Sequence, residues 1–131
     1  MSLIEAVRIL ADNFALGVVV TDGELTEPGP RLLYVNPAFE RMTGYSAREV
    51  LGRNPRVLQG KKTSLASRKA LAQALRHALP HKTSLVNYRK NGEAYLCEIN
   101  VFPVCNADGL LVNAIAIERE VKRGPGRPRR A

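Results

Sequence analysis

Apolar and polar residues recur with two different periods along the chain, and the changes of period separate helices from strands. Five apolar residues near the start recur at helical spacing: Leu3, Ile4, Val7, Leu10 and Ala11. They predict a short amphipathic helix over residues 2–11. Residues 17–22 and 31–36 are β-branched or aromatic runs on either side of the Gly- and Pro-rich segment 23–30. These two runs predict a pair of strands around a loop.

Helix-capping signals mark the middle of the chain. Pro37 follows Asn36, which is the order of an N-cap and a first helical residue. Ser46 and Glu49 have the spacing of a capping box, so two brief helical turns are expected between residues 37 and 51. Ser64 precedes residues 65–80, whose apolar stripe predicts the longest helix, ended by Pro80.

The remaining third of the chain predicts three strands, over residues 83–90, 93–104 and 110–121, joined by the turns "NG" and "NADG". Two strands, several helices and then three strands favour an α+β fold, in which a five-stranded antiparallel sheet carries helices on one face. Such a sheet is expected to enclose a pocket beneath the helices.

Length and charge narrow the class of protein. The 131 residues suffice for one domain. The net charge is +8, but residues 122–130 carry five of the positive charges, which leaves +3 for residues 1–120. The N-terminus lacks the pattern of a secretory signal, and no apolar run approaches the roughly 18 residues of a membrane span. We therefore expect a cytoplasmic protein without a membrane segment.

The two cysteines, Cys97 and Cys105, lie eight residues apart in one predicted strand, so free thiols are expected rather than a disulfide. No Cys/His cluster has the spacing of a metal site. His77 and His81 flank Pro80 at a helix end, where a solvated role is expected. No Ser/His/Asp or Cys/His constellation is evident, so the sequence predicts a protein that is not an enzyme.

Two motifs resemble a known family. "GRNPRVLQG" at residues 52–60 and "NYRKNG" at residues 87–92, within this order of elements, resemble the PAS superfamily and specifically its flavin-binding blue-light branch, the LOV domains. The resemblance covers roughly residues 14–120. It divides the chain into an N-terminal helix (1–13), a PAS/LOV-like domain (14–120) and a basic tail (121–131), which is expected to be disordered.

The resemblance implies a set of flavin-binding residues. Asn54 and Gln59 would line the ribityl chain, Arg56 and Arg68 would hold the phosphate, and Asn87 would bond the pyrimidine edge. In LOV domains a cysteine between the Asn and the Arg of the first motif forms a covalent adduct with the flavin under blue light. Pro55 occupies that position here, and proline has no nucleophile. Adduct photochemistry is therefore excluded at this position.

The ring end of the implied site departs from the pattern. Cys97 stands where a second flavin-binding Asn is expected, and Glu118 stands where a Gln normally reads the flavin edge. The missing amides would leave polar atoms of the ring without partners, at about 1–3 kcal/mol each. Val57 and Ala114 also replace bulkier aromatic residues. Non-covalent flavin mononucleotide (FMN), another ligand and an empty cavity all stay open.

The last predicted strand has two unlike faces. Ala114, Ala116 and Glu118 share one face, so Ile115 and Ile117 share the other. If the first face lines the pocket, the isoleucines form an outer apolar patch, which a monomer seldom leaves bare. We expect the helix over residues 2–11 and a second copy of the chain to cover it.

The C-terminal tail, "VKRGPGRPRRA", resembles an AT-hook, in which a Gly-Arg-Pro core lies in the minor groove of A·T-rich DNA. The usual Arg-Gly-Arg-Pro is interrupted here. The basic residues that would contact DNA are Arg123, Arg127, Arg129 and Arg130. A solubilising tail or a linker is the alternative interpretation.

The sequence as a whole predicts a stand-alone, LOV-like PAS sensory or regulatory module that acts by ligand sensing and dimerisation, with a signalling protein as partner. Two alternatives stay open. One is a DNA-associated regulator that uses its tail, and the other is a redox sensor with non-covalent flavin. The sequence does not identify the ligand, the partner or the full extent of the gene product.

Overall fold

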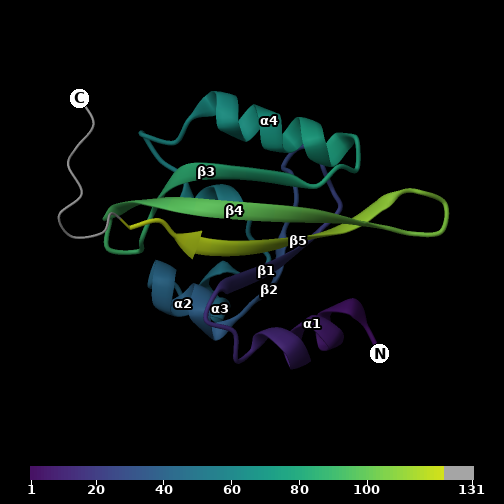
Figure 1. Ribbon diagram of the computed structural model, residues 1–131, viewed down its shortest axis with the longest axis horizontal. Helices are drawn as coiled ribbons and strands as arrows, with labels where there is room; N and C mark the ends of the chain where they lie inside the picture. The colour runs from purple at the N-terminus through teal and green to yellow at the C-terminus, as the bar shows by residue number, and fades with distance from the viewer. Residues whose placement is uncertain (123–131) are drawn as a thin grey trace.

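The computed structural model describes residues 1–122 (Figure 1). Its elements, in chain order, are α1 (Leu3–Ala11), β1 (Gly17–Asp22), β2 (Leu32–Val35), α2 (Pro37–Thr43), α3 (Ala47–Val50), the 3-10 helix η1 (Pro55–Leu58), α4 (Leu65–Arg76), β3 (His81–Tyr88), β4 (Ala94–Cys105) and β5 (Leu111–Glu120).

The five strands form one antiparallel sheet in the order β2-β1-β5-β4-β3. The central strand β5 therefore pairs with the first strand of the chain, and β2 and β3 are the edges. In Figure 1, α4 lies beside β3 and α1 lies near β1 and β2. The predicted fold, a five-stranded antiparallel α+β sheet with helices, is confirmed.

The α-helices begin within one residue of the predicted positions, whereas the 3-10 helix η1 was not predicted. Ser2 and Ser46 each form a capping box with the glutamate three residues later. The Asn36 side chain accepts a hydrogen bond from the backbone N–H of Phe39 and so caps α2, with Pro37 as its first residue. Each cap satisfies backbone donors that the first helical turn leaves free.

The longest helix ends four residues earlier than predicted, because the chain turns into the left-handed region at Ala78, with φ 52°. The N–H of Leu79 donates to the carbonyl of Ala74 at 2.9 Å, and the N–H of Ala78 donates to that of Leu75 at 3.0 Å. These two bonds make a Schellman motif, which most often has glycine at the left-handed position. An alanine there gives no sequence signal of a helix end, so the prediction for residues 77–80 was wrong.

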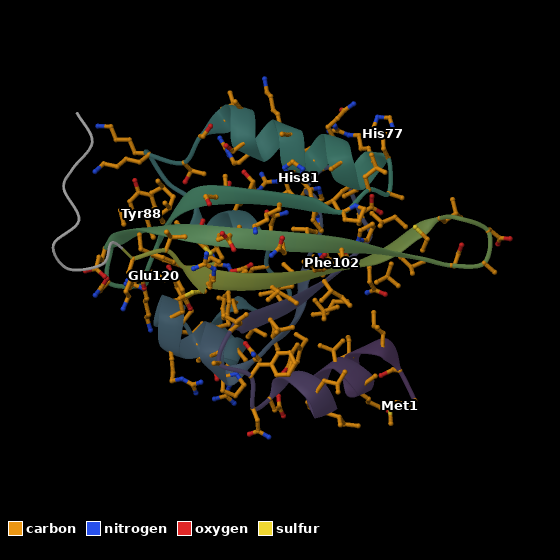
Figure 2. All side chains as sticks on the ribbon, viewed as in Figure 1. Met1, His77, His81, Tyr88, Phe102 and Glu120 are labelled. Atoms are coloured by element: carbon orange, nitrogen blue, oxygen red, sulfur yellow. The ribbon has the colours of Figure 1, made fainter. Side chains whose placement is uncertain are left out.

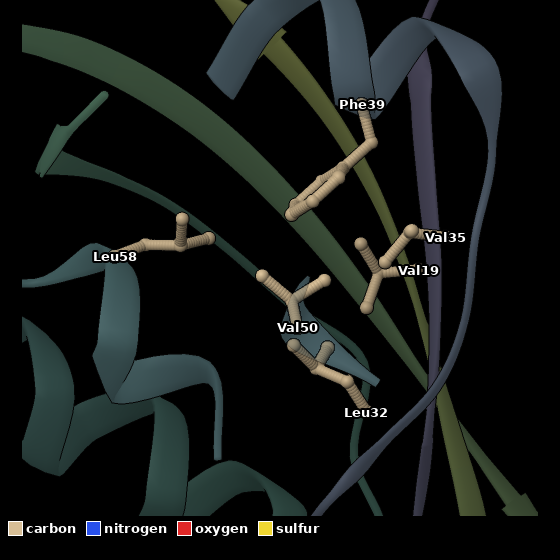
Figure 3. Close-up of a cluster of buried hydrophobic side chains, with 6 residues drawn as sticks. All are labelled: Val19, Leu32, Val35, Phe39, Val50 and Leu58. Atoms are coloured by element: carbon tan, nitrogen blue, oxygen red, sulfur yellow. The ribbon is translucent and has the colours of Figure 1, made fainter. Parts of the chain in front are cut away.

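The inner face of the sheet packs against α2, α3 and η1. Figure 3 shows this cluster, in which Phe39, Val50 and Leu58 from the helices point toward side chains of β1 and β2. A bulge between Val20 and Thr21 changes the register with β2, so that both Leu32 and Val35 contribute to the cluster. This packing fixes the helices over one end of the sheet.

The outer face of β1 carries α1. Val18, Val20 and Tyr34 form a cluster there with Ala11, and Leu3, Ile4, Val7 and Ile115 pack against it. The expected contact between the N-terminal helix and the outer face is confirmed. Helices therefore cover both faces of the sheet, four of them on the inner face and α1 on the outer.

Asn36 links α1, β1 and α2 through the hydrogen bonds of its side chain. Its side chain is fully buried, and its Oδ1 accepts hydrogen bonds from the N–H groups of Val18 and Phe39 at 2.8 and 3.0 Å. Its Nδ2 donates to the carbonyls of Ala11 and Leu16, both at 2.9 Å. One amide thus joins the end of α1, the start of β1 and the start of α2, so these elements keep a fixed relation to one another.

Candidate ligand-binding site

A cavity of about 410 Å³ lies between the inner face of the sheet and the covering helices. Its walls are mostly apolar, and its volume falls in the range of about 300–1,000 Å³ that small-molecule sites usually have. The sheet supplies one wall, and α2, η1, α4 and the loop before β2 supply the rest. The apolar part of the lining includes Val19, Phe39, Leu58, Leu71, Leu75, Leu85, Ile99 and Val101.

Guanidinium groups gather where η1, α4 and the 23–30 loop meet. Arg56 donates from Nη2 to the carbonyl of Pro28 at 2.8 Å, and its side chain is about half exposed. Arg68 donates from Nη1 to Oε1 of Gln59 at 3.2 Å. Both arginines and Gln59 line the cavity, as does Arg76 from the last turn of α4. This end of the cavity is therefore cationic and suits an anionic group such as a phosphate.

Asn54 lines the cavity, but its side-chain amide forms hydrogen bonds with other groups of the protein. Its Nδ2 donates to the carbonyls of Pro28 and Pro30 at 3.2 and 2.9 Å, and its Oδ1 accepts from the backbone and the Nε of Arg56. A Cβ on Gly29, whose φ is +93°, would lie 2.6 Å from Asn54 Nδ2. The loop is thus packed directly onto Asn54, which acts as its anchor.

Pro55 is the first residue of η1, with Asn54 as the N-cap. The first N–H of a helix has no internal partner, so proline loses nothing at this position, and its fixed φ favours the turn. The ring of Pro55 lines the cavity. The turn therefore accommodates proline without loss of a backbone hydrogen bond and presents its saturated ring to the cavity.

The inner end of the cavity contains two buried polar side chains from the sheet. Asn87 is 3% exposed on β3, and Glu118 is 6% exposed on β5; both line the cavity. Burial raises the pKa of the Glu118 carboxyl from its usual 4.5 to about 7, although a hydrogen bond from the Cys97 thiol opposes the shift. A carboxyl in this setting is close to half protonated at neutral pH, so it can donate a hydrogen bond as well as accept one.

Cys97 lies behind Glu118 and does not line the cavity. Its side chain is fully buried, with Sγ 3.8 Å from Oε1 of Glu118. Burial is the main cause that raises its thiol pKa, and the neighbouring Glu118 raises it further. An inert thiol at this depth is not a nucleophile. Cys97 therefore contacts Glu118 rather than the cavity.

The structure brings six of the seven predicted ligand residues to one cavity: Asn54, Arg56, Gln59, Arg68, Asn87 and Glu118. Sequence reasoning missed Arg76 and Glu27, which also line it. Arg76 lies eight residues after Arg68 in α4, so helical periodicity was a usable signal for that residue. Glu27 is 3.7 Å from Arg56, a contact that depends on the path of the loop and had no sequence signal.

The two predicted interface residues lie on the outer face of β5. Ile115 is partly buried against the α1 cluster, and it pairs in register with Phe102 of β4. Phe102 and Leu96 are 44% and 41% exposed. These two apolar side chains thus stay uncovered on the outer face of β4, with Glu98 and Asn100 between them. The predicted DNA-contacting residues Arg123, Arg127, Arg129 and Arg130 lie outside the described residues.

Both cysteines are free, as expected. Within residues 1–122, no group of three or more Asp, Glu, His or Cys side chains is arranged to hold a metal ion. None of the helices in that range has the length and apolar character needed to cross a bilayer.

Comparison with known proteins identifies the fold family. The model of the PAS domain family matches residues 16–123. The chain belongs to the PAS domain family. Among solved structures, the LOV domain of a blue-light-activated histidine kinase from Erythrobacter litoralis EL346 is 32% identical, with a TM-score of 0.77, covering 85% of this chain and all of that chain. An RNA-binding light-oxygen-voltage receptor is 35% identical, with a TM-score of 0.80, covering 90% of this chain and 33% of that chain.

Curated relatives of this PAS domain are much longer proteins. A blue-light-activated histidine kinase of Brucella canis is 38% identical over 114 residues, which are 87% of this chain and 23% of the kinase. A nitrogen fixation regulatory protein of Klebsiella oxytoca is 36% identical over 97 residues, which are 74% of this chain and 20% of that protein. The chain thus spans less than a quarter of these relatives. It is a LOV-like PAS module of the kind that such proteins carry, and the predicted resemblance is confirmed.

Proposed function

We propose that this PAS domain is a sensory module that takes up a small anionic ligand in its cavity and signals without forming a cysteinyl adduct. One observation carries the proposal: a mostly apolar cavity with a cationic end holds a proline ring where the LOV motif has its reactive cysteine. The cavity supports ligand uptake, and the proline supports a mode of sensing that needs no covalent bond.

Non-covalent FMN is the ligand that the lining fits best. When bound, flavin supplies a ring that absorbs blue light and can accept electrons. Arg56 and Arg68 would hold its phosphate, with Gln59 beside them, and Arg76, at the other end of α4, adds a third cation to the lining. The apolar walls would exclude water from the ring. Because Asn54 is engaged with the 23–30 loop, it would position that loop over the ligand rather than bind the ribityl chain strongly.

The ring end fits flavin only when Glu118 is protonated. An ionised carboxylate would repel an electron-rich carbonyl edge, whereas a carboxylic acid can donate to it. The raised pKa of Glu118, about 7, makes the donor form available near neutral pH. We infer that flavin affinity falls as pH rises from 6 to 8, because the donor at this position is lost.

An absorption spectrum of the purified protein, before and after incubation with FMN, tests ligand uptake. Structured absorption in the blue and quenched flavin fluorescence are expected. Neither signal, at FMN concentrations up to 100-fold above those of the protein, would reject flavin as the ligand.

The Pro55→Cys variant tests the absence of the adduct. Restoring a thiol at the first position of η1 should give reversible bleaching of the blue band under illumination, while the natural chain keeps its band. Pro55→Ser is the matched control, because it changes the same position without adding a thiol. Bleaching of the natural chain would contradict the proposal.

The output surface that we propose is the outer sheet face, covered by a second copy of the chain. Its apolar part combines the exposed side chain of Phe102 with Ile117 and the part of Ile115 that α1 leaves uncovered. The Glu98–Arg119 ion pair separates this part from the exposed Leu96, and exposed apolar side chains of this kind support a protein contact. A ligand at the inner face and a partner at the outer face would share β5, which gives a short route between them.

A further inference from the structure

Acidic residues are missing from a long central segment. Residues 50–92 contain ten Lys and Arg and no Asp or Glu, although the whole chain has 12 acidic residues. This segment forms η1, α4 and β3. These three elements therefore contribute positive charges and no negative charge to the molecule.

Five of these residues define what we call the cationic face: Lys61, Lys62, Arg68, Lys69 and Arg76. The two lysines 61 and 62 lie in the turn before α4, where the N–H of Lys62 donates to the Tyr88 hydroxyl at 2.9 Å. Arg76 ends α4, next to His77. In Figure 2, Tyr88 and His77 lie toward opposite ends of the layer that α4 forms with β3. The cationic face thus extends along the whole of α4.

The charges of the cationic face are uncompensated. All five side chains belong to exposed residues, and none forms an ion pair among residues 1–122. Other basic residues of the segment behave differently, since Arg56, Lys82, Arg89 and Lys90 each lie within 4.0 Å of a glutamate. Like charges repel one another when nothing opposes them, so the face costs stability in the free protein and gains from an anionic partner.

We propose that the cationic face binds the phosphate backbone of a double-stranded nucleic acid. Lysine and arginine side chains supply most phosphate contacts in such complexes, and they need no base recognition. Arg68 and Arg76 are eight residues apart on α4, which places them about 12 Å apart along its axis. Both arginines also line the cavity, so the contacts with a duplex rest on Lys61, Lys62 and Lys69, which are exposed and lie outside that lining.

An anionic membrane fits the face less well than a duplex does. A helix that lies on a bilayer needs a continuous apolar stripe to enter it. The apolar stripe of α4, with Leu71 and Leu75, is turned to the cavity. Leu65 and Leu79, which are 55% and 56% exposed, lie at opposite ends of the helix. They do not form a stripe.

Fluorescence anisotropy with a labelled 20-base-pair duplex, from 50 to 200 mM salt, tests the proposal on the full chain. The test variant is Lys61→Gln/Lys62→Gln/Lys69→Gln, which leaves the cavity lining untouched. A control with the same loss of charge is Arg31→Gln/Arg41→Gln/Arg48→Gln, at exposed positions before the segment. A third variant, Arg127→Gln/Arg129→Gln/Arg130→Gln, removes charge from the tail.

Each lost phosphate contact should reduce the slope of log K against log salt by about 1. The test variant should therefore lose about 3 from the slope and at least about tenfold in affinity, while the Arg31 control changes little. Equal losses in the test variant and the Arg31 control would overturn the proposal, as would binding lost only with the tail variant. Tighter binding to vesicles of anionic lipid than to the duplex would overturn it as well. Because the three lysines do not line the cavity, these results are independent of flavin uptake.

Discussion

Glu118 should make the stability of this domain fall as pH rises through neutrality. Its carboxyl is 6% exposed on β5, and burial raises its pKa from 4.5 to about 7. Between these two values the folded state holds a proton that the unfolded state has released, so the free energy of unfolding decreases with rising pH. Each pH unit in that window costs about 1.36 kcal/mol, which gives a total of about 3 kcal/mol at pH 8.

The Glu118→Gln variant removes this titration while keeping the size of the side chain. It should match the natural chain closely near pH 5 and be more stable by about 3 kcal/mol at pH 8, since an amide carries no charge to bury. For a domain of this size the difference corresponds to roughly 10 °C in Tm. Cys97 can still donate its S–H to the amide oxygen, so the neighbouring contact survives.

Urea unfolding followed by circular dichroism at pH 5, 6, 7 and 8 measures the effect, and unchanged m values would confirm that only stability differs. Asp108→Asn, at an exposed turn between β4 and β5, is the matched control for replacing an acid by an amide. The reasoning is refuted if the stability difference between Glu118→Gln and the natural chain is the same at pH 5 and pH 8.

Three further predictions rest on single contacts. Ala78→Gly should stabilise the domain by about 0.5–1 kcal/mol, because glycine suits the left-handed position that ends α4. Ala70→Gly, within the exposed face of α4, should destabilise the domain by about the same amount. Thermal unfolding of the two variants measures both effects. Asn36→Ala should cost about 3 kcal/mol or more in urea unfolding, since several backbone groups lose their partner, and a loss below 1 kcal/mol would contradict this. Phe102→Glu should convert a dimer to a monomer in light scattering; Ile115→Glu should do the same but also weaken the packing of α1, and an unchanged mass in both would remove the proposed interface.

Most of the fold could be predicted because capping and turn residues mark where its helices and strands begin and end. Asn36, Ser46 and Ser64 act as N-caps in the structure as their spacing indicates, and the strands follow from β-branched runs between turn residues. The end of α4 could not be predicted, since Ala78 takes a conformation that the sequence signals only through glycine. Local sequence rules predict the end of a helix where the usual residue, such as glycine, stands at that position. They fail where another residue adopts the same backbone conformation.

The residues of the candidate site could be predicted mainly from the resemblance to LOV domains. Arg56, Gln59 and Arg68 all line the cavity, and Arg68 donates a hydrogen bond to Gln59. Cys97 was assigned a ligand contact because the resemblance to LOV domains places it where a flavin-binding Asn is expected, and its side chain does lie in the inner cluster with Ile99 and Val101. The length of the Glu118 side chain, which fills the space between that thiol and the cavity, is a tertiary effect that no pattern along β4 reveals.

The buried amide of Asn36 adds to the free energy needed to release α1 from the sheet. Of its four hydrogen bonds, one is to α1, through the Ala11 carbonyl, and the others are to Leu16, Val18 and Phe39. Release of the helix would break that bond and would expose Val18, Val20 and Tyr34 on the outer sheet face. Undocking α1 therefore costs a buried hydrogen bond, about 1–3 kcal/mol, in addition to the newly exposed apolar surface.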